Sequence, residues 1–456
     1  MRAGGGSRSV RCWLAVRASG GLRSVRCWLA VRASGGLRSV RCWLAVVRAG
    51  GGSRSVRRHI AAAVVLTAVL AATLGTADAG ASSPPALGVR AAALIEESTG
   101  QLLYGVNDSA QVAIASTTKL MTALVTLHHA RLSDVFTDPD FIPAAQDSQI
   151  HLQPGERMSV HDLLIAMLLP SADDAAEDLA FNVGHGSVAR FVGMMNARAR
   201  ELHLTHTHYT TPSGLDTAGN YSSARDLVTL ARFLLRSEPF VRAVVSKPSA
   251  ILRTGNEIRH VINLNDLVAR FPWINGVKTG HTLDAGYVLV ASGTRDGMTL
   301  IDVVLGTSSE AARDATALSL LNYGFDNFRL ETPVHRGELL ASRPAKDQPH
   351  ERARLIATAS YTHVLPRSAH IHVRVHAPAL LVGPLPAHAV VGWATVLAGG
   401  RVEARIPLEL AAALPQIRTS KGPEKVVLLS ATLSGLVLAA GAAIGLRMFW
   451  REWTRG

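Results

Sequence analysis

The spacing of apolar side chains divides the middle of the chain into helices and strands. Between residues 116 and 235 apolar positions recur every three or four residues, which predicts amphipathic helices, and short apolar runs on either side predict strands. Because these strands must pair across long helical segments, residues 82–328 predict an α+β domain with helices packed on a mainly antiparallel sheet. We expect helices at 120–125, 160–169, 175–181, 224–235 and 311–323, and strands at 91–96, 101–104, 258–262, 286–291 and 299–305.

A different pattern begins near residue 329. Apolar and polar residues alternate over short stretches such as 370–375, 390–396 and 402–408, with turn-forming residues between them. Alternation with a period of two is typical of strands that bury one face. Residues 329–416 therefore predict a small all-β domain.

Both ends of the chain carry apolar segments of the kind associated with export. Two arginines, an apolar run and a small-residue stretch make 57–81 a predicted signal peptide, with an uncleaved membrane anchor as the alternative. Residues 417–425 predict a linker to 426–446, which is uncharged and long enough to cross a bilayer as a helix. The arginines that follow predict a cytoplasmic tail at 447–456, with the folded domains on the outer face of the cytoplasmic membrane.

Most of the positive charge lies in a repeated N-terminal segment. Residues 1–79 contain 13 arginines, no lysine and one acid, and so account for +12 of the net charge of +13. The nearly neutral remainder offers no basic surface to nucleic acid. A 15-residue unit rich in Gly, Arg and Ser recurs through residues 1–56, so we expect this segment to be disordered or untranslated. All three cysteines lie in the repeats, and we expect neither a metal site nor a cofactor in the folded domains.

A hydroxyl and an amine lie three residues apart, at Ser116 and Lys119, where the apolar run 120–125 begins. Side chains at i and i+3 share one face of a helix, so the amine can lie beside the hydroxyl. A buried lysine that loses its proton near neutral pH can activate a serine as a nucleophile. By itself the Ser-x-x-Lys pattern is common, and a capping serine followed by a solvated lysine is the simpler interpretation.

Two further motifs follow the first at spacings of about 50 and 100 residues, Ser171-Ala172-Asp173 and Lys278-Thr279-Gly280. The ordered set Ser-x-x-Lys, Ser-Asp-Asn and Lys-Thr-Gly is typical of serine β-lactamases and penicillin-binding proteins. Finding all three types of element in order makes Ser116 a candidate nucleophile.

At these motifs the chain resembles the low-molecular-mass penicillin-binding proteins, the serine D-alanyl-D-alanine carboxypeptidases of the peptidase S11 family. The resemblance covers roughly residues 84–325, and the following β-rich domain and C-terminal membrane attachment match the family's layout. It implies a β-lactamase/transpeptidase-like fold for the first domain. The segments that carry it are 115–122, 168–176, 212–216, 221–227 and 275–282.

The resemblance assigns catalytic roles to three residues. Ser116 would attack the carbonyl between two terminal D-alanines and form an acyl-enzyme that water later hydrolyses. Lys119 would be the general base that takes the serine proton, and Ser171 would relay a proton to the departing D-alanine. These roles match the general requirements of a nucleophile that is activated by a neighbouring base.

The third motif would bind the substrate. Lys278 would hold the terminal carboxylate of the peptide, Thr279 would add a hydroxyl, and Gly280 belongs to the same substrate-binding strand. The backbone N–H groups of Ser116 and His281 would form the oxyanion hole, worth about 3 kcal/mol per donor. The bland alternatives are an exposed strand lysine at 278 and an ordinary turn residue at 281.

Asp173 departs from the family pattern, which has asparagine at this substrate-binding position. An amide donates and accepts hydrogen bonds, whereas a carboxylate only accepts them. A carboxylate between two lysines also favours the protonated form of Lys119, which is the wrong state for a base. We therefore expect slower acylation than in an asparagine enzyme, or a shifted pH optimum.

The sequence as a whole favours an exported, membrane-anchored D,D-carboxypeptidase that acts on peptidoglycan pentapeptides and is acylated by β-lactam inhibitors. A D,D-endopeptidase on the same site and a catalytically weak wall-binding protein stay open as alternatives. A β-lactamase is less favoured, because no Glu-x-x-x-Asn segment lies between the second and third motifs. The composition predicts no nucleic-acid partner.

Overall fold

The computed structural model describes residues 9–18, 21–30, 41–43, 84–139, 141, 144, 147–346 and 348–415. The chain divides into two compact units, residues 1–80 and 81–456. The predicted signal peptide, linker, membrane span and tail lie outside the described residues. Within the described residues, no helix is long and apolar enough to cross a membrane. The predictions for those segments therefore stay predictions.

The N-terminal repeats contain strands where we expected disorder. β1 (Ser9–Ala18), β2 (Gly21–Ala30) and β3 (Arg41–Trp43) form an antiparallel sheet in the order β1-β2-β3. Three of the repeats include a Val-Arg-Cys-Trp-Leu run, and β-branched and aromatic residues favour strands. Copies of one β-forming unit can pair with each other in this way, and the expectation that residues 1–56 are disordered or untranslated stays a prediction.

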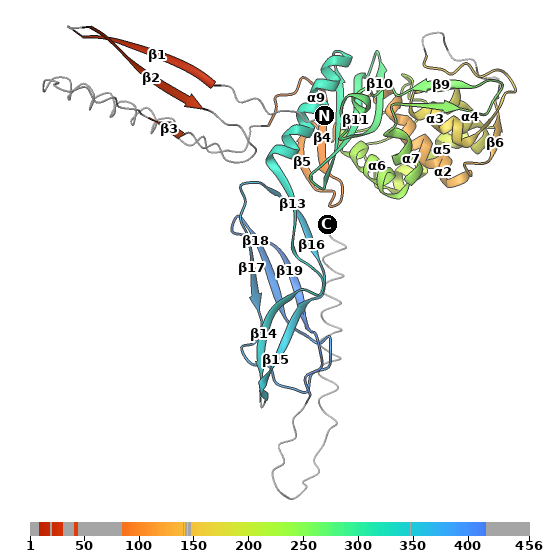
Figure 1. Ribbon diagram of the computed structural model, residues 1–456. Helices are drawn as coiled ribbons and strands as arrows, with labels where there is room; N and C mark the ends of the chain where they lie inside the picture. The colour runs from red at the N-terminus through yellow and green to blue at the C-terminus, as the bar shows by residue number, and fades with distance from the viewer. Residues whose placement is uncertain are drawn as a thin grey trace, which may run out of the picture. The chain divides into compact units, whose positions relative to one another are not determined.

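A five-stranded antiparallel sheet, in the order β10-β11-β12-β4-β5, forms the centre of the α+β region (Figure 1). The predicted hairpin is present as its last two strands, and the predicted strands at 286–291 and 299–305 form its middle. The third motif lies on the first strand, at one edge. The bounds are β4 (Ala91–Glu96), β5 (Leu102–Val106), β10 (Ile274–Thr282), β11 (Gly286–Arg295) and β12 (Met298–Thr307).

Helices cover both faces of this sheet, and alternate residues of its strands belong to two separate cores. Ala93 and Val303 face the larger core with the central helices, whereas Leu94 and Val304 face a smaller core with the last helix. The helical bounds are η1 (Ala115–Thr118), α2 (Lys119–His129), α3 (Val160–Leu168), α4 (Asp173–Val183), α5 (Val188–Glu201), α6 (Ala224–Ser237), α7 (Pro239–Val245), α8 (Leu267–Arg270) and α9 (Glu310–Asn327).

Two small ribbons lie among these helices in the sequence. β6 (Val135–Thr137) pairs with β7 (Arg157–Ser159), and β8 (Ser249–Leu252) pairs with β9 (Arg259–Ile262), both in antiparallel fashion. The second ribbon contains the strand predicted at 258–262.

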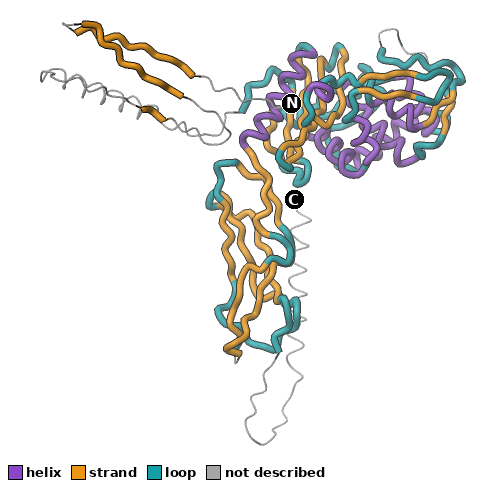
Figure 2. The backbone as a smooth tube through the Cα atoms, in the orientation of Figure 1, coloured by secondary structure: helices purple, strands orange, loops and turns teal. Residues whose placement is uncertain are grey.

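After residue 327 the described secondary structure consists of strands alone, as predicted (Figure 2). The larger sheet has the order β14-β15-β19-β18-β17, and β13 pairs with β16. Leu355, Val396, Ile406 and Leu408 belong to the buried core of this region. The bounds are β13 (Phe328–Val334), β14 (Leu339–Ala345), β15 (Gln348–Ala357), β16 (Tyr361–Pro366), β17 (Ile371–His376), β18 (Val390–Ala398) and β19 (Arg401–Leu410).

Candidate active site

The first motif lies where η1 passes into α2. Ser116 is half-buried in η1, and Lys119, the first residue of α2, is completely buried. The residue before the serine, Ala115, has a φ of +46°, a region that costs a non-glycine residue of order 1 kcal/mol or more. Such strain beside a candidate nucleophile is typical of sites where the surrounding structure fixes the geometry.

The Lys119 amine makes three hydrogen bonds. Its Nζ donates to the Ser116 Oγ at 3.0 Å, to the Asp173 Oδ1 at 2.5 Å and to the Ser213 carbonyl oxygen at 3.0 Å. The sequence predicted the first two neighbours. Three acceptors around Nζ can take all three N–H donors of an ammonium group, and the Ser116 hydroxyl can also donate to a neutral amine at this distance. Proton transfer from the serine requires the lysine to lose one of those protons first.

The third acceptor belongs to a turn that motif reasoning did not assign to the site. Gly214 in this turn has a φ of +90°, and a Cβ there would lie 2.0 Å from the Ala115 carbonyl oxygen. The Thr122 Oγ1 donates to the Pro212 carbonyl at 2.6 Å and ties the turn to α2. The Pro-Ser-Gly sequence signals a turn, but its position beside the lysine, 94 residues away, is a tertiary fact.

The second motif precedes and begins α4. Asp173 is the first residue of this helix and forms the buried ion pair with Lys119. Ser171 is 3% exposed and has a φ of +67°, and its hydroxyl has no hydrogen bond among the described residues. The structure therefore brings Asp173 into contact with the lysine but gives Ser171 no contact that tests the predicted relay.

The third motif lies on β10, which is an edge strand of the described sheet and packs against η1. An edge strand leaves backbone groups on one side free to pair with an extended peptide. A Cβ at Gly280 would approach the Ser116 nitrogen to 2.9 Å, so only glycine allows this close contact between the strand and η1. His281 is exposed, and its ring packs on Tyr287 with the ring centroids 4.0 Å apart.

Lys278 and Thr279 are both buried, and the Lys278 Nζ donates to the Thr279 carbonyl at 3.1 Å. Burial lowers the pKa of Lys278 well below its ordinary value, and the Lys119 charge lowers it further, while Asp173 acts in the opposite direction. The Lys119–Asp173 ion pair and the packing of β10 against η1 bring the three motifs to one site. A carboxylate placed at Lys278 would favour its charged form.

Two acids on α4 were missed by motif reasoning. Glu177 lies one turn after Asp173, and burial together with the Asp173 charge raises its pKa to about 7, while Lys119 opposes this. Burial and Asp138 raise the pKa of Asp178 to about 7 as well. The i+4 spacing of Glu177 from Asp173 was the available signal, but only the packed structure shows that Glu177 is half-buried and Asp178 is buried.

A half-buried serine, a buried lysine within hydrogen-bond distance and an edge strand packed beside them form the arrangement expected of a serine acyl-transferase or hydrolase site. No cluster of three or more metal-ligating side chains is found among the described residues.

The family model for D-alanyl-D-alanine carboxypeptidases, Peptidase S11, matches residues 78–309. The chain belongs to this family of serine-type D-alanyl-D-alanine carboxypeptidases. Both the predicted family and the predicted class of enzyme are therefore confirmed.

Curated relatives agree with this assignment. The chain is 32% identical over 369 residues to the D-alanyl-D-alanine carboxypeptidase DacD of Salmonella typhimurium, an alignment that covers 77% of this chain and 93% of the relative. It is 35% identical over 287 residues to a D-alanyl-D-alanine carboxypeptidase of Streptomyces sp. strain K15, covering 59% and 98% of the two chains.

A solved structure supports the fold beyond the peptidase region. Penicillin binding protein 6B from Escherichia coli matches with a TM-score of 0.59 and 29% identity over 72% of this chain and 97% of that one. The α+β, transpeptidase-like part of the predicted fold is thereby confirmed.

Proposed function

We propose that this protein is an exported D,D-carboxypeptidase that removes the terminal D-alanine from peptidoglycan pentapeptides. The observation that carries the proposal is the Ser116–Lys119 contact, 3.0 Å long, beside an edge strand that bears Lys278. The family to which the chain belongs supports the choice of substrate.

The chemistry follows from these positions. After Lys119 loses a proton, it accepts the Ser116 proton as the Oγ attacks the penultimate carbonyl, and the C–N bond to the last D-alanine breaks. The departing amine takes a proton, for which Ser171 is the proposed relay. Water then cleaves the ester and restores the serine. Lys278 and Thr279 would hold the carboxylate of the terminal residue, and the Ser116 and His281 N–H groups would stabilise the oxyanion.

A β-lactam would acylate the same serine, because its strained amide resembles the peptide bond that is cleaved. The direct test measures D-alanine release from a synthetic pentapeptide and labelling by fluorescent penicillin, with full-length protein and its Ser116→Ala variant. Release and stable labelling that both disappear in the variant are expected. A protein that neither releases D-alanine nor labels would overturn the proposal.

The same measurements separate the alternatives. Labelling without D-alanine release would identify a catalytically weak penicillin-binding protein, which the Asp173–Lys119 ion pair makes the second candidate. Rapid loss of the label would indicate a β-lactamase. Cleavage of cross-linked dimers in preference to pentapeptides would indicate a D,D-endopeptidase.

We also propose that the protein is anchored to the outer face of the cytoplasmic membrane by residues 426–446, with a signal peptide at 57–81. An uncharged apolar segment followed by arginines supports the anchor. Fractionation of cells that express the full chain or a chain ending at residue 425 is the test. The full chain should stay with the membrane, and its mature N-terminus, found by mass spectrometry, should lie near residue 80. Equal release of both chains would contradict the anchor.

A further inference from the structure

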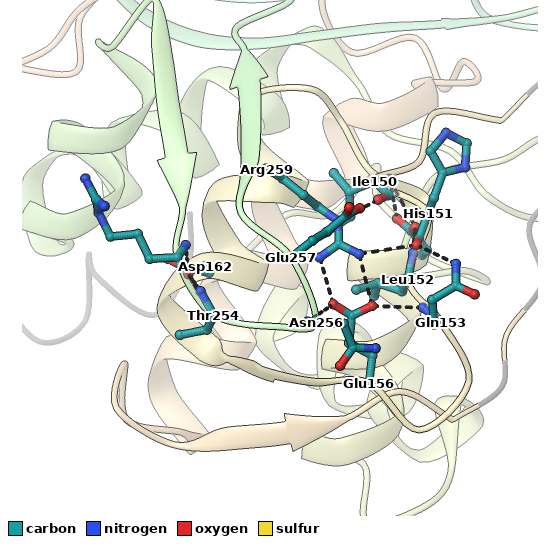
Figure 3. A network of polar contacts seen from close by, with 12 residues as sticks. Ile150, His151, Leu152, Gln153, Glu156, Asp162, Thr254, Asn256, Glu257 and Arg259 are labelled. Atoms are coloured by element: carbon teal, nitrogen blue, oxygen red, sulfur yellow. Dashed lines mark hydrogen bonds and ion pairs between the residues drawn. The ribbon is translucent and has the colours of Figure 1, made fainter.

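Arg259 on β9 binds Glu156 and the backbone of residues 150–151, which lie near the second motif (Figure 3). Its guanidinium donates to both carboxylate oxygens of Glu156 at 2.7 and 3.0 Å, and its Nε donates to the Ile150 carbonyl at 2.9 Å. A longer contact of 3.4 Å joins it to the His151 carbonyl. The Arg259 side chain is 8% exposed and that of Glu156 is 0% exposed, so water does not screen this ion pair.

The opposite side of the same segment is bound by the first turn of α4. Asp174 accepts hydrogen bonds from the backbone N–H groups of Ile150 and Leu152 at 3.1 Å. The Asp173 N–H donates to the Ser148 carbonyl at 2.7 Å. Residues 148–152 thus lie between a cation that binds their carbonyl groups and an anion that binds their N–H groups.

This connection matters because α4 has no side-chain cap of its own. Its N-cap residue is Ala172, which offers no hydrogen-bond acceptor in its side chain. The first turn of α4 also carries the Asp173 carboxylate, 2.5 Å from the Lys119 amine. Residues 148–152 therefore bind the helical turn that carries this carboxylate, through the Asp173 N–H and the Asp174 side chain.

We propose that Arg259, held by Glu156, is a positioning residue for the catalytic lysine. It fixes residues 148–152, which fix the first turn of α4 and so the contact of Asp173 with Lys119. The inference rests on the proposed function, because it assumes that Lys119 acts as the base for acylation of Ser116.

The pH dependence of acylation distinguishes positioning from simple structural support. Lys119 is faced by Asp173, by Glu177 further along α4 and by Lys278 on β10. If Arg259→Lys loosens the Asp173 contact, the lysine gives up its proton more readily, and the acid limb of the rate profile moves down by about one pH unit. The maximal rate should fall about tenfold, since small displacements of reacting groups are costly.

The experiment measures the rate of penicillin acylation of the full-length protein between pH 5 and 9, alongside thermal unfolding. The isosteric Glu156→Gln keeps one acceptor for Arg259. It should move the acid limb of the rate profile in the same direction as Arg259→Lys, but by a smaller amount. In an Asp173→Asn background, Arg259→Lys should leave the limb unmoved, because no carboxylate remains to be displaced.

Asp162 offers a matched control, because it binds the ribbon of β8 and β9 to a different helix. Asp162 on α3 accepts from the Arg253 N–H at 2.7 Å and from the Thr254 N–H and hydroxyl at 2.8 Å, and it does not contact residues 148–152. Asp162→Asn should lower stability without moving the acid limb.

Folded Arg259→Lys and Glu156→Gln proteins with the wild-type limb would overturn the inference, as would an equal shift in the Asp162→Asn control. Wild-type protein that is not acylated at all would instead overturn the proposed function.

Discussion

A single carboxylate distinguishes this active site from the motif it resembles. Asp173 contacts the Lys119 amine at 2.5 Å, within a set of three acceptors that matches a protonated lysine. Both groups are buried, so their attraction is stronger than at the surface. The site is therefore arranged with the lysine in its charged state, and the catalytic cycle must overcome this preference.

Asp173→Asn should accelerate penicillin acylation at neutral pH, by about tenfold. The amide still accepts from Lys119 and can also donate to a substrate carbonyl, but it no longer stabilises the ammonium as an anion does. Acylation rates of the full-length proteins at pH 7 test this expectation. Asp134→Asn, at a surface ion pair with Arg131, serves as a control that should leave the rate unchanged. An unchanged or lower rate for Asp173→Asn contradicts the argument.

The lysine of the third motif also differs from an exposed strand lysine. Lys278 is 1% exposed, and its pKa is lowered because burial and the Lys119 charge disfavour a second ammonium. The substrate carboxylate should restore the charge when it binds. We expect Lys278→Gln, which keeps a donor but no charge, to raise KM for a pentapeptide more than it lowers kcat. An effect confined to kcat would place the role of Lys278 in the chemical step instead.

At the scale of elements, helix starts divide into those with local caps and those without. Ser159, Ser187, Ser223 and Ser309 each accept a hydrogen bond from the third residue of the helix that follows, at 3.1 to 3.3 Å. A serine cap is visible in a sequence. The start of α4 depends instead on Ser148, 25 positions earlier, and no local pattern reports such a contact.

The central sheet contains a buried acid with no partner. Asp302 on β12 is 0% exposed, and neither of its carboxylate oxygens has a hydrogen bond among the described residues. Its strand neighbours in register are Ala291 and Leu94, both buried. Burial raises the pKa of Asp302 well above its ordinary value, so the folded protein holds it as the neutral acid.

Asp302→Val should stabilise the protein at pH 8 by about 2 kcal/mol or more, because it removes an unpaired polar group from an apolar site and favours the strand. Thermal unfolding of the full-length variant measures the effect. Asp302→Asn, which keeps a polar group of the same shape, should gain less. A valine variant that is less stable than wild type at pH 8 would show that the Asp302 carboxyl makes a stabilising contact in the folded protein.

At the scale of the whole molecule, buried acids link stability to pH. The pKa values of Glu177 and Asp178 rise to about 7 on folding, from ordinary values of 4.5 and 3.8. Between these limits the folded state keeps protons that the unfolded state has lost. For these two groups stability should therefore fall as the pH rises from about 4 to 7 and then level off, and Asp302, whose pKa is also raised by burial, adds a fall in the same direction.

Thermal unfolding between pH 5 and 8 should show this trend, with a higher Tm at pH 5. Each of the two groups contributes at most about 3 kcal/mol. In the Glu177→Gln/Asp178→Asn double variant the slope should be smaller, with the remainder due to Asp302, and the protein should be more stable at pH 8. The carboxyls with lowered pKa values, Glu156 and Asp162, lose their contribution only at more acidic pH. A wild-type Tm that rises with pH over this range would refute the assignment.

Much of the fold was predictable because it depends on local patterns. The hairpin at 91–106, the main helices and the strands after residue 328 follow from apolar periodicity. The pairing of β1, β2 and β3 was not predicted, because composition says little about whether identical units pair. The turn at 212–214, which supplies the third acceptor of the Lys119 amine, could not be placed beside the lysine, since the two are remote in sequence.

The sequence by itself determined the family, the candidate nucleophile and base, and the departure at Asp173, because these depend on residue types at short, ordered spacings. The tertiary structure alone decided how those residues are charged and held. Burial and distance set the Lys119–Asp173 ion pair, the lowered pKa of Lys278 and the raised pKa values of Glu177 and Asp178 on α4. It also decided that Arg259 reaches residues 148–152, because contacts across a hundred positions are fixed by packing and leave no local pattern.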